Sequence, residues 1–553
     1  MLALNRRHFL SLAAAASASA RTTREGPEAR GSYGVVAAEP PDSARAGARM
    51  LQDGGNAIDA AAAACLAACM LEPQMVDLGG YVLCAVVLDA KTGRVWNLDA
   101  NSVSPAAATE SMYEVGPKGL GRGINENEYQ CSVRGDLNIG GPLAVGVPGV
   151  MGGIGRLHEK WGRLKWPALF QPSLELLDRG FPYGNVVTGI RNRESVIRSL
   201  PAAQKHLMPG GKIPDATDIW HRPDMAGTLQ RLAKSGWRDF YEGELGRAIA
   251  GHVQSLGGIL TREDMKRFEP RIVASYESSF RGARIHSGIL ANGGLSVAQL
   301  LNMWDCLPPQ PLTDPMYWHQ LIEAGKLAWR DRLRYFGDGV DPERFLSKDY
   351  AAGRIEALRM FPKSIDRQVM SPAGTSPGTV NISAADAEGN IVAVTLSHGG
   401  SFGSCVTVPG TGITLGHGMS RFDPRPGRPN SVGPSKRPLN NVCPTIIRLP
   451  DRVVALGLRG GRRIVSVAAH ACRQIVEHGA SGLEAVKAPR LHVEEQEPVE
   501  VTRGLDQSIV GKLNALGHEV RVANDVAGPA NVCERLKDKS LRGASNVWAV
   551  GVS

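Results

Sequence analysis

The residues best suited to chemistry in this sequence begin at Thr379. From Gly378 the sequence is Gly-Thr-Val-Asn-Ile-Ser-Ala-Ala-Asp, in which apolar Val380 and Ile382 alternate with polar residues. This period of two predicts a β-strand, and a turn rich in Asp and Gly leads into a return strand over 391–395. A threonine hydroxyl is a weak nucleophile, but a free α-amine on the same residue, with a pKa of about 8, can serve as its base. That amine exists only if the Gly378–Thr379 bond is cut, and the pattern also fits an ordinary hairpin.

Gly460 and Gly461 form a second candidate site. They lie between an apolar run over 453–458, which predicts a strand, and a predicted helix over 462–478 that ends at Gly479. Backbone N–H groups at a helix N-terminus favour negative charge, and glycine permits close approach. The pair could therefore hold a tetrahedral oxyanion, although a tight strand-to-helix turn would use the same residues.

Periodicity also predicts the elements that must position these residues. The sequence predicts a helix capped by Ser43 and ended by Gly54-Gly55, a buried Ala-rich helix over 56–70, a hairpin of strands 81–88 and 94–98, a mainly helical region over 149–370 that includes a long helix over 316–336, and strands over 379–386, 391–398, 403–408 and 411–415. Hairpins in both halves with flanking helices suggest two stacked sheets between layers of helices.

Further motifs surround the Thr379 hairpin in a fixed order. Downstream they are 401–403 (Ser-Phe-Gly), 433–439 (Gly-Pro-Ser-Lys-Arg-Pro-Leu), 444–447 (Pro-Thr-Ile-Ile), 460–462 (Gly-Gly-Arg) and 488–492 (Ala-Pro-Arg-Leu-His). Upstream they are 37–40 (Ala-Ala-Glu-Pro), 54–61 (Gly-Gly-Asn-Ala-Ile-Asp-Ala-Ala), 79–80 (Gly-Gly) and 141–149 (Gly-Pro-Leu-Ala-Val-Gly-Val-Pro-Gly). Together they resemble the γ-glutamyltransferase family over essentially the whole chain after residue 32.

The resemblance implies an α+β fold, the four-layer αββα sandwich of the N-terminal-nucleophile hydrolases. It implies one domain built from two autoprocessed fragments, a large subunit over 21–378 and a small subunit over 379–553. Thr379 would be both the site of self-cleavage after Gly378 and the later nucleophile. Ser397 would hydrogen-bond the nucleophile, and Gly460 and Gly461 would form the oxyanion hole. Because the α-amine acts as the base, His398 is expected to be a bystander.

The positions that bind the acyl donor in that family differ here. The family's arginine for the donor α-carboxylate is replaced by Asn101, and its acid for the donor α-amine is replaced by Arg421. A neighbouring asparagine is Gly399, and two serines are Asn440 and Asn441. An ammonium next to an arginine would be repelled. The sequence therefore predicts a donor with a carboxylate and no α-amine, such as a dicarboxylic monoamide or a glutaryl amide, held by Arg421.

Three functions follow from these residues. The first is an autoprocessing threonine amidohydrolase or acylase that cuts a small-molecule amide through an acyl-Thr379 intermediate. The second is a true γ-glutamyltransferase or glutathione hydrolase, whose donor contacts come from other positions. The third is an uncleaved, non-catalytic relative.

Composition limits the partners and cofactors. The 43% apolar and 21% charged residues describe an ordinary globular chain, and there is no apolar run of 18 residues that would predict a transmembrane helix. The formal net charge of +9 comes from scattered Lys and Arg, with no nucleic-acid motif. The nine cysteines show no Cys-x-x-Cys pair and no zinc spacing, so free thiols and no metal or other cofactor are expected.

The first twenty residues predict a targeting segment. Asn-Arg-Arg-His-Phe-Leu over 5–10 is a twin-arginine pattern, a short, mildly apolar stretch follows, and Ala-Ser-Ala over 18–20 is a small-x-small cleavage site. The sequence therefore predicts twin-arginine export to the periplasm. A fortuitous pair of arginines at a basic N-terminus is the alternative.

Overall fold

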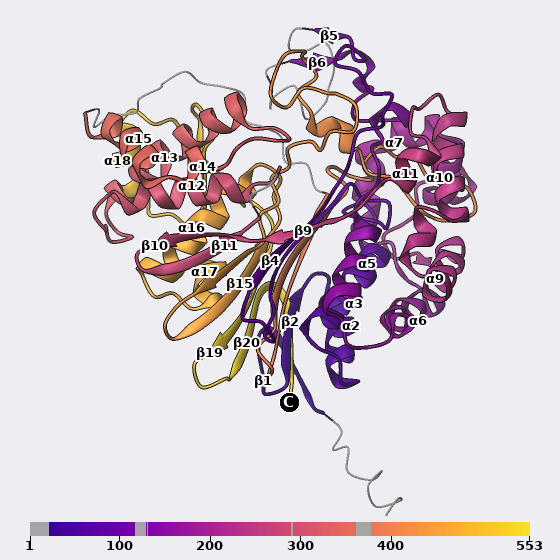
Figure 1. Ribbon diagram of the computed structural model, residues 1–553, viewed down its shortest axis with the longest axis horizontal. Helices are drawn as coiled ribbons and strands as arrows, with labels where there is room; N and C mark the ends of the chain where they lie inside the picture. Colours follow the sequence, from indigo (N-terminus) through magenta and orange to yellow (C-terminus); the bar gives the residue numbers. More distant parts are fainter. Residues whose placement is uncertain (1–20, 117–128, 130, 289–290, 361–377) are drawn as a thin grey trace, which may run out of the picture.

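A large, strongly bent β-sheet forms the centre of the molecule, with helices on both of its outer sides (Figure 1). The computed structural model describes residues 21–116, 129, 131–288, 291–360 and 378–553. The predicted targeting segment, 1–20, lies outside the described residues. The expected mixture of helices and strands is present throughout the described chain.

The central sheet has thirteen strands. In the order of their hydrogen-bonded neighbours twelve of them are β10 (Tyr276–Phe280), β11 (Ala283–Ser287), β14 (Thr445–Arg448), β15 (Arg452–Leu458), β19 (Ala530–Leu536), β20 (Leu541–Val552), β2 (Gly34–Ala38), β12 (Thr379–Asp386), β13 (Ile391–Ser397), β3 (Val82–Leu88), β4 (Val95–Asn101) and β9 (Arg271–Ala274), and β1 (Thr23–Gly31) also pairs with β20. Within the described residues the paired strands are antiparallel, except for the parallel pair of β17 with β18. The pairing is continuous, so the expected two sheets are joined through β19, β20 and β2.

One group of helices covers the sheet on the side of β2, β12, β13 and β3 (Figure 1). It comprises α2 (Pro41–Gln52), α3 (Ala57–Leu71), α5 (Val150–Trp161), α6 (Gln171–Arg179), α7 (Val186–Ser199), α8 (Pro201–Leu207), α9 (Pro223–Ser235), α10 (Glu244–Ser255) and α11 (Arg262–Lys266). The fully buried α3 packs directly against β12 and β13. Because alanine side chains are small, the helix can approach these two strands closely, and β12 begins at the candidate nucleophile.

A second group of helices covers the opposite side of the sheet, over β11, β14, β15 and β19 (Figure 1). It comprises α12 (Gly294–Asp305), α13 (Pro315–Tyr335), α14 (Glu343–Leu346), α15 (Lys348–Met360), α16 (Arg463–Glu477), α17 (Gly482–Lys487) and α18 (Gln507–Ala515). Smaller sheets are formed by β16 (Leu491–His492), β17 (Val499–Thr502) and β18 (Val520–Ala523), by β5 (Val115–Gly116) with β6 (Ser132–Val133), and by β7 (Phe181–Pro182) with β8 (Ile219–Trp220).

The two halves of the bent sheet lie face to face, because β12 and β13 also contact β15 and β19. On β12, Val380 and Ile382 belong to the core under α3, as the period of two predicts. The alternating polar residues are buried as well. Asn381 donates to the Pro529 carbonyl at 3.3 Å, and the Ser383 hydroxyl donates to the Asn531 carbonyl at 3.0 Å. Buried polar groups that find such partners fix the register between the two halves of the sheet.

Two predictions about local structure are wrong. Helix α2 begins at Pro41, with Pro40 as its N-cap, so Ser43 lies in the first turn and does not cap the helix. Residues 403–408 and 411–415 form a loop with one isolated bridge between Thr407 and Thr414 in place of two strands. Positive φ angles within and beside this segment, at Phe402 (55°) and Cys405 (62°) among others, are incompatible with extended strands.

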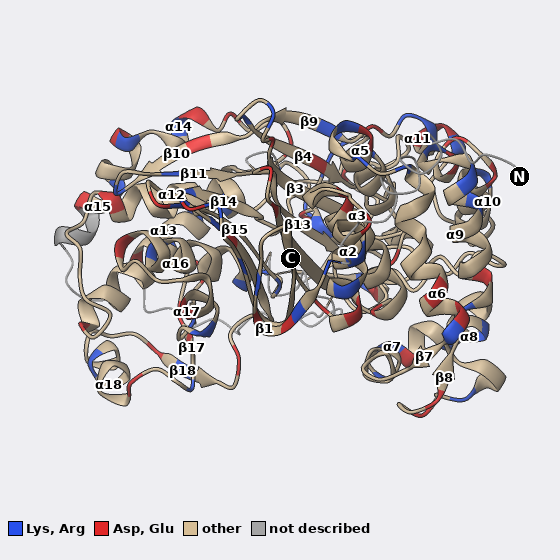
Figure 2. Cartoon of the chain, turned by 90° about the horizontal axis from the view of Figure 1, so that it is seen from below, with Lys and Arg blue, Asp and Glu red and all other residues tan. Residues whose placement is uncertain are grey.

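Charged residues of both signs are interspersed over the helices of both groups (Figure 2). Within the described residues, no helix is both long and apolar enough to cross a bilayer. All nine cysteines are free thiols, as predicted, and all but Cys306 are buried.

Candidate active site

Thr379 is the first residue of β12 and pairs directly with Ser397 at the end of β13. The two hydroxyl oxygens are 3.0 Å apart and hydrogen-bonded. Thr379 is 6% exposed, so its hydroxyl lies at the edge of the core and not on the open surface. The antiparallel register of the hairpin thus brings together two of the residues singled out from the sequence.

The carbonyl oxygen of Gly378 accepts three hydrogen bonds. The Ser397 hydroxyl donates to it, and the backbone N–H groups of His398 and Gly399 donate at 2.9 and 3.3 Å. This carbonyl belongs to the bond predicted to be cleaved. Converging donors polarise a carbonyl and stabilise the oxyanion that forms when it is attacked.

The direction of the Thr379–Ser397 hydrogen bond follows from counting protons. A serine hydroxyl has one proton, and that of Ser397 is donated to the Gly378 carbonyl. Ser397 must therefore accept the Thr379 proton, and it also accepts the Gly399 N–H at 2.8 Å. The chain Thr379–Ser397–Gly378 aligns the hydroxyl of the candidate nucleophile with the carbonyl that it would attack.

Gly378 is required at its position by space. A β-carbon added there would lie 2.7 Å from the Gly400 N atom and 2.8 Å from the Gly400 Cα, closer than real contacts allow. Gly399 is required by both space and conformation: its φ is +97°, and a β-carbon would lie 2.4 Å from the His417 Nε2. The two glycines therefore let the backbone at Gly378 lie close to the backbone that follows Ser397.

A cavity of about 370 Å³ opens beside Gly378 and Thr379. Its walls come from the loop before β3, from α7, from the turn between β15 and α16, and from the segment before β19. Gly460 lies in the wall, and α16 begins three residues later at Arg463. Among the described residues, no hydrogen bond uses the N–H of Gly460 or Gly461. Within this part of the chain the Gly460 donor is therefore free in the wall of a cavity that Thr379 also lines, and the free Gly461 donor follows it directly in the sequence.

Arg421 lies away from this cavity, in a short 3₁₀ helix over Gly418–Arg421. Its guanidinium Nη2 donates to the Gly399 carbonyl at 2.5 Å and lies over the Tyr81 ring, 5.7 Å from the ring centre. The side chain is buried and does not pair with Asp423, whose carboxylate binds Arg425 at 2.8 Å. In the described structure Arg421 thus supports the backbone that follows Ser397, and its role in donor binding stays a prediction.

Three of the other predicted donor-binding residues, all asparagines, also contact groups of the protein itself. Asn101 Nδ2 donates to the Pro438 carbonyl at 2.6 Å. The Asn440 carbonyl and the Asn441 Oδ1 accept from Arg332 Nη2 at 2.6 and 3.0 Å. None of the three lines the described wall of the cavity. Their predicted roles toward substrate therefore stay predictions.

The roles of two groups at this site were not predicted from the sequence. His398 contributes its backbone N–H to the Gly378 carbonyl, while burial lowers the pKa of its imidazole to about 3, so the side chain is neutral near pH 7. Arg459, next to Gly460, lines the cavity. Backbone donors have no side-chain signature, but the position of Arg459 directly before the glycine pair could have been noticed.

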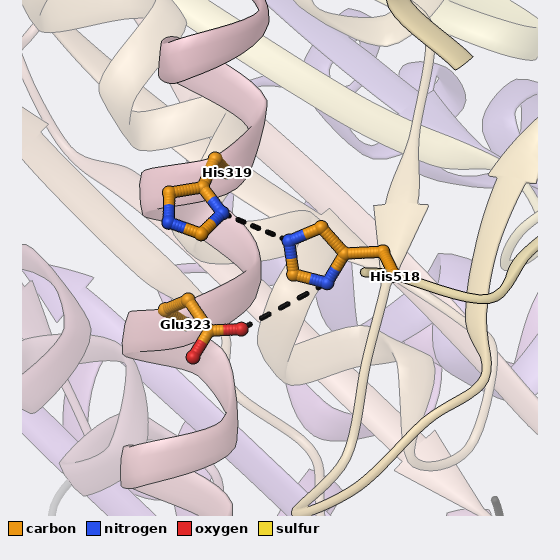
Figure 3. Close-up of side chains that lie close together, drawn as sticks. All are labelled: His319, Glu323 and His518. Carbon is orange, nitrogen blue, oxygen red and sulfur yellow. Dashed lines mark hydrogen bonds and ion pairs between the residues drawn. The ribbon is translucent and has the colours of Figure 1, made fainter. Parts of the chain in front are cut away.

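Within the described residues, one group of two histidines and a carboxylate lies close enough together to be considered for a metal ion (Figure 3). His319 and Glu323 project from α13, and His518 approaches from the loop before β18, with its Nε2 2.8 Å from the His319 Nδ1. Lys326 Nζ binds Glu323 at 2.9 Å and Glu497 at 2.6 Å. The ammonium already supplies a cation to these carboxylates, so the arrangement is that of a buried ion network.

Comparisons with known proteins agree with one another. A family model described as Gamma-glutamyltranspeptidase matches residues 43–553. The Acylase ACY 1 proenzyme of Pseudomonas sp. (strain SE83) is 33% identical over 537 residues, covering 95% of this chain and 93% of that protein. The Glutathione hydrolase proenzyme of Bacillus subtilis (strain 168) is 29% identical, covering 88% and 85%. The crystal structure of cephalosporin acylase from Bacillus halodurans superposes with a TM-score of 0.81 at 26% identity, covering 94% of each chain.

Proposed function

Because the chain belongs to the gamma-glutamyltranspeptidase family, we propose that it is a self-processing acylase that uses Thr379 as an N-terminal nucleophile. It cuts itself between Gly378 and Thr379, and the processed protein hydrolyses a small-molecule amide through an acyl-Thr379 ester. The observation that carries this proposal is the set of hydrogen bonds around the Gly378 carbonyl and the Thr379 hydroxyl.

Self-cleavage follows from this geometry as an N-to-O acyl shift. The Thr379 oxygen attacks the Gly378 carbonyl carbon, and the oxygen of that carbonyl becomes an oxyanion between Ser397 and the N–H groups of His398 and Gly399. The C–N bond breaks and the Thr379 nitrogen takes up the proton that the Thr379 hydroxyl lost, which leaves an ester and a free α-amine. Water then hydrolyses the ester and frees the Gly378 carboxylate and the Thr379 hydroxyl.

Turnover repeats this chemistry on a substrate. The α-amine accepts the proton of the Thr379 hydroxyl as its oxygen attacks the amide carbonyl. The free N–H groups of Gly460 and Gly461 are suited to the resulting oxyanion. The protonated amine gives its proton to the departing nitrogen, and water then hydrolyses the acyl-Thr379 ester. No histidine takes part in these steps, which agrees with the buried, neutral imidazole of His398.

The acyl donor is proposed to carry a carboxylate and no α-amine. An arginine, Arg421, stands where the family has an acid for the donor ammonium, and that ammonium would be repelled here. The acylase named above is 33% identical to this chain, and the glutathione hydrolase is 29% identical. Both relatives are named as proenzymes, which supports processing. A dicarboxylic monoamide such as a glutaryl amide fits these requirements.

The architecture and location belong to the same proposal. Fragments 21–378 and 379–553 would remain associated in one domain, since β12 and β13 of the second fragment pair with β2 and β3 of the first. The sheet folded face to face between two groups of helices supports a four-layer αββα sandwich. Export to the periplasm rests on the twin-arginine pattern of residues 1–20.

Purified protein tests the proposal directly. The small fragment is expected to begin Thr-Val-Asn-Ile-Ser by N-terminal sequencing, and the processed protein to hydrolyse glutaryl-p-nitroanilide faster than γ-glutamyl-p-nitroanilide. An intact chain would exclude the enzyme, and a different N-terminus would exclude Thr379. Equal or faster turnover of the γ-glutamyl donor would make the protein a γ-glutamyltransferase or glutathione hydrolase instead.

A further inference from the structure

Arg459 is a positively charged residue in the wall of the cavity that Thr379 also lines. It directly follows β15, which ends at Leu458, and it precedes Gly460, the first of the two proposed oxyanion donors. Its side chain is 27% exposed. A guanidinium is therefore accessible in the same cavity as the nucleophile, whereas Arg421 is buried away from that cavity.

The backbone of Arg459 is fixed while its charged end remains available. Its N–H donates to the Pro529 carbonyl at 3.2 Å, and its carbonyl accepts from the Gly528 N–H at 2.9 Å. A β-carbon at Gly528 would lie 2.6 Å from the Arg459 Cγ and Nε, so glycine makes room for the arginine stem. The side chain is thus held along the cavity wall.

The charge of Arg459 is poorly compensated within the described residues. Its side chain donates no hydrogen bond there, and the one carboxylate within 4 Å is Glu39, 3.4 Å from its Nε. Burial raises the pKa of Glu39 to about 8, against the opposing effect of the Arg459 charge, so this carboxyl is largely protonated near pH 7. By contrast, Arg463 in the same wall binds both oxygens of Glu500 at 2.7 and 2.8 Å.

Two acidic residues also line the cavity, and neither neutralises Arg459 through a contact. Glu72 accepts a hydrogen bond from Gln74 at 2.6 Å, and burial raises the pKa of its carboxyl against the opposing charge of Arg459. Asp525 is mostly exposed and lies 3.7 Å from the Arg490 Nη1. A guanidinium that donates no hydrogen bond within the described residues, and that lines the same cavity as Thr379, is a strong partner for an incoming carboxylate.

We infer that Arg459 binds the carboxylate of the substrate and so determines specificity for anionic amides. This inference rests on the proposed acylase function and moves the carboxylate partner from Arg421 to the cavity wall. The carboxylate can belong to the acyl group or to the leaving amine, because Arg459 and Thr379 line one cavity. The chemistry of recognition is the same in both cases.

Three substrates separate these possibilities. Glutaryl-p-nitroanilide carries the carboxylate on the acyl group, the pentanoyl amide of 4-aminobenzoate carries it on the leaving group, and pentanoyl-p-nitroanilide carries none. For Arg459→Ala we expect kcat/KM to fall about ten- to a hundredfold for at least one anionic substrate, chiefly through KM. The neutral anilide should change less than twofold, and whichever anionic substrate falls identifies the side that Arg459 contacts.

Controls distinguish binding from folding. Arg459→Lys should recover part of the loss because it keeps the charge but not the bidentate geometry. Arg191→Ala, an exposed arginine on α7 outside the cavity wall, should match the wild type. Self-cleavage should be complete in all of these variants. An equal fall for all three substrates, or no fall for any of them, would overturn the inference.

A binding measurement keeps the inference separate from the proposed function. Glutarate represents the acyl side of these substrates, and 4-aminobenzoate represents the leaving side. At least one of the two anions should bind the processed wild-type protein in isothermal titration calorimetry and bind Arg459→Ala at least tenfold more weakly. If the wild type hydrolyses none of the substrates but shows this difference, the acylase proposal fails and the assignment of Arg459 stands. If neither anion binds the wild type more tightly than Arg459→Ala, the assignment of Arg459 is wrong.

Discussion

The start of the β12–β13 hairpin and the region around Arg421 lie next to each other but differ in how they satisfy their polar groups. At the hairpin, the Thr379 hydroxyl, the Ser397 hydroxyl and the Gly378 carbonyl are joined in one chain of hydrogen bonds that ends at a cavity. Around Arg421, the guanidinium binds the Gly399 carbonyl, and Asn440 and Asn441 bind Arg332.

The difference separates residues arranged for the proposed cleavage from residues that were predicted to bind the substrate. The polar groups at the start of the hairpin surround the Gly378–Thr379 bond, so their arrangement suits the proposed self-cleavage, which requires no substrate. Around Arg421, the guanidinium, the Asn440 backbone carbonyl and the Asn441 side chain are bound by other groups of the protein, so the residue types at these positions do not by themselves identify a substrate group. The accessible charge next to the nucleophile belongs to Arg459 instead.

The largest expected effect comes from Thr379→Ala. Without the hydroxyl there is neither an attack on the Gly378 carbonyl nor an acyl-enzyme, so the chain should remain uncut and inactive. Mass spectrometry and an anilide assay measure the two losses. Thr379→Ser, which retains a hydroxyl, should still be processed. A cut chain in the alanine variant would show that another residue begins the cleavage.

Ser397→Ala should have the next largest effect. It removes one of the three donors to the Gly378 carbonyl and the acceptor of the Thr379 proton. Loss of a single oxyanion donor lowers a rate by about a hundredfold or more, so self-cleavage should slow by at least that factor. The rate is followed by gel electrophoresis after rapid purification. Ser397→Thr should restore most of it, and an unchanged rate in the alanine variant would remove Ser397 from the mechanism.

Arg421→Ala compares the two regions directly. If Arg421 supports the Gly399 backbone, as its 2.5 Å hydrogen bond indicates, the variant should process more slowly and lose about tenfold in kcat for anionic and neutral donors alike. Steady-state kinetics with glutaryl- and pentanoyl-p-nitroanilide measure this ratio. A loss confined to the glutaryl donor, with normal processing, would instead support the donor-binding role predicted from the sequence.

Glu497→Gln should have the smallest effect on catalysis, because Glu497 belongs to the buried ion network and does not line the described wall of the cavity. The variant therefore serves as a comparison for the substitutions at the candidate site. Burial opposes ionisation of Glu497, but His518 and Lys326 outweigh it and lower its pKa to about 2 from 4.5. The stabilisation is therefore present above about pH 4.5 and is lost as the pH falls towards 2.

At neutral pH, the Glu497→Gln variant should lose roughly 2–3 kcal/mol of unfolding free energy. Denaturant titration of the uncut Thr379→Ala protein, with and without the second substitution, measures this loss. The difference between the two proteins should shrink in acid. A difference that is independent of pH would contradict the assigned charge state.

The hairpin, the position of Thr379 at its start and the family could all be predicted from the sequence. Alternation along β12 depends on neighbours in the chain, and the pairing of Thr379 with Ser397 follows from the short turn between the strands. The glycines at 378, 460 and 461 were also identifiable, because the backbone geometry that they permit is local. These features can be predicted from neighbouring residues, without knowledge of contacts between distant segments.

The residues that surround the hairpin, by contrast, depend on the tertiary structure and could not be predicted from the sequence. The segment 403–415 has apolar alternation but forms a loop, because positive φ angles turn its backbone away from strand geometry. The polar residues of β12 face inward because the second half of the sheet supplies their partners. Whether Arg421 or Arg459 reaches the cavity depends on how segments far apart in the chain pack around Thr379. Residue identity fixes the charge of each arginine, and packing fixes which of them a substrate can meet.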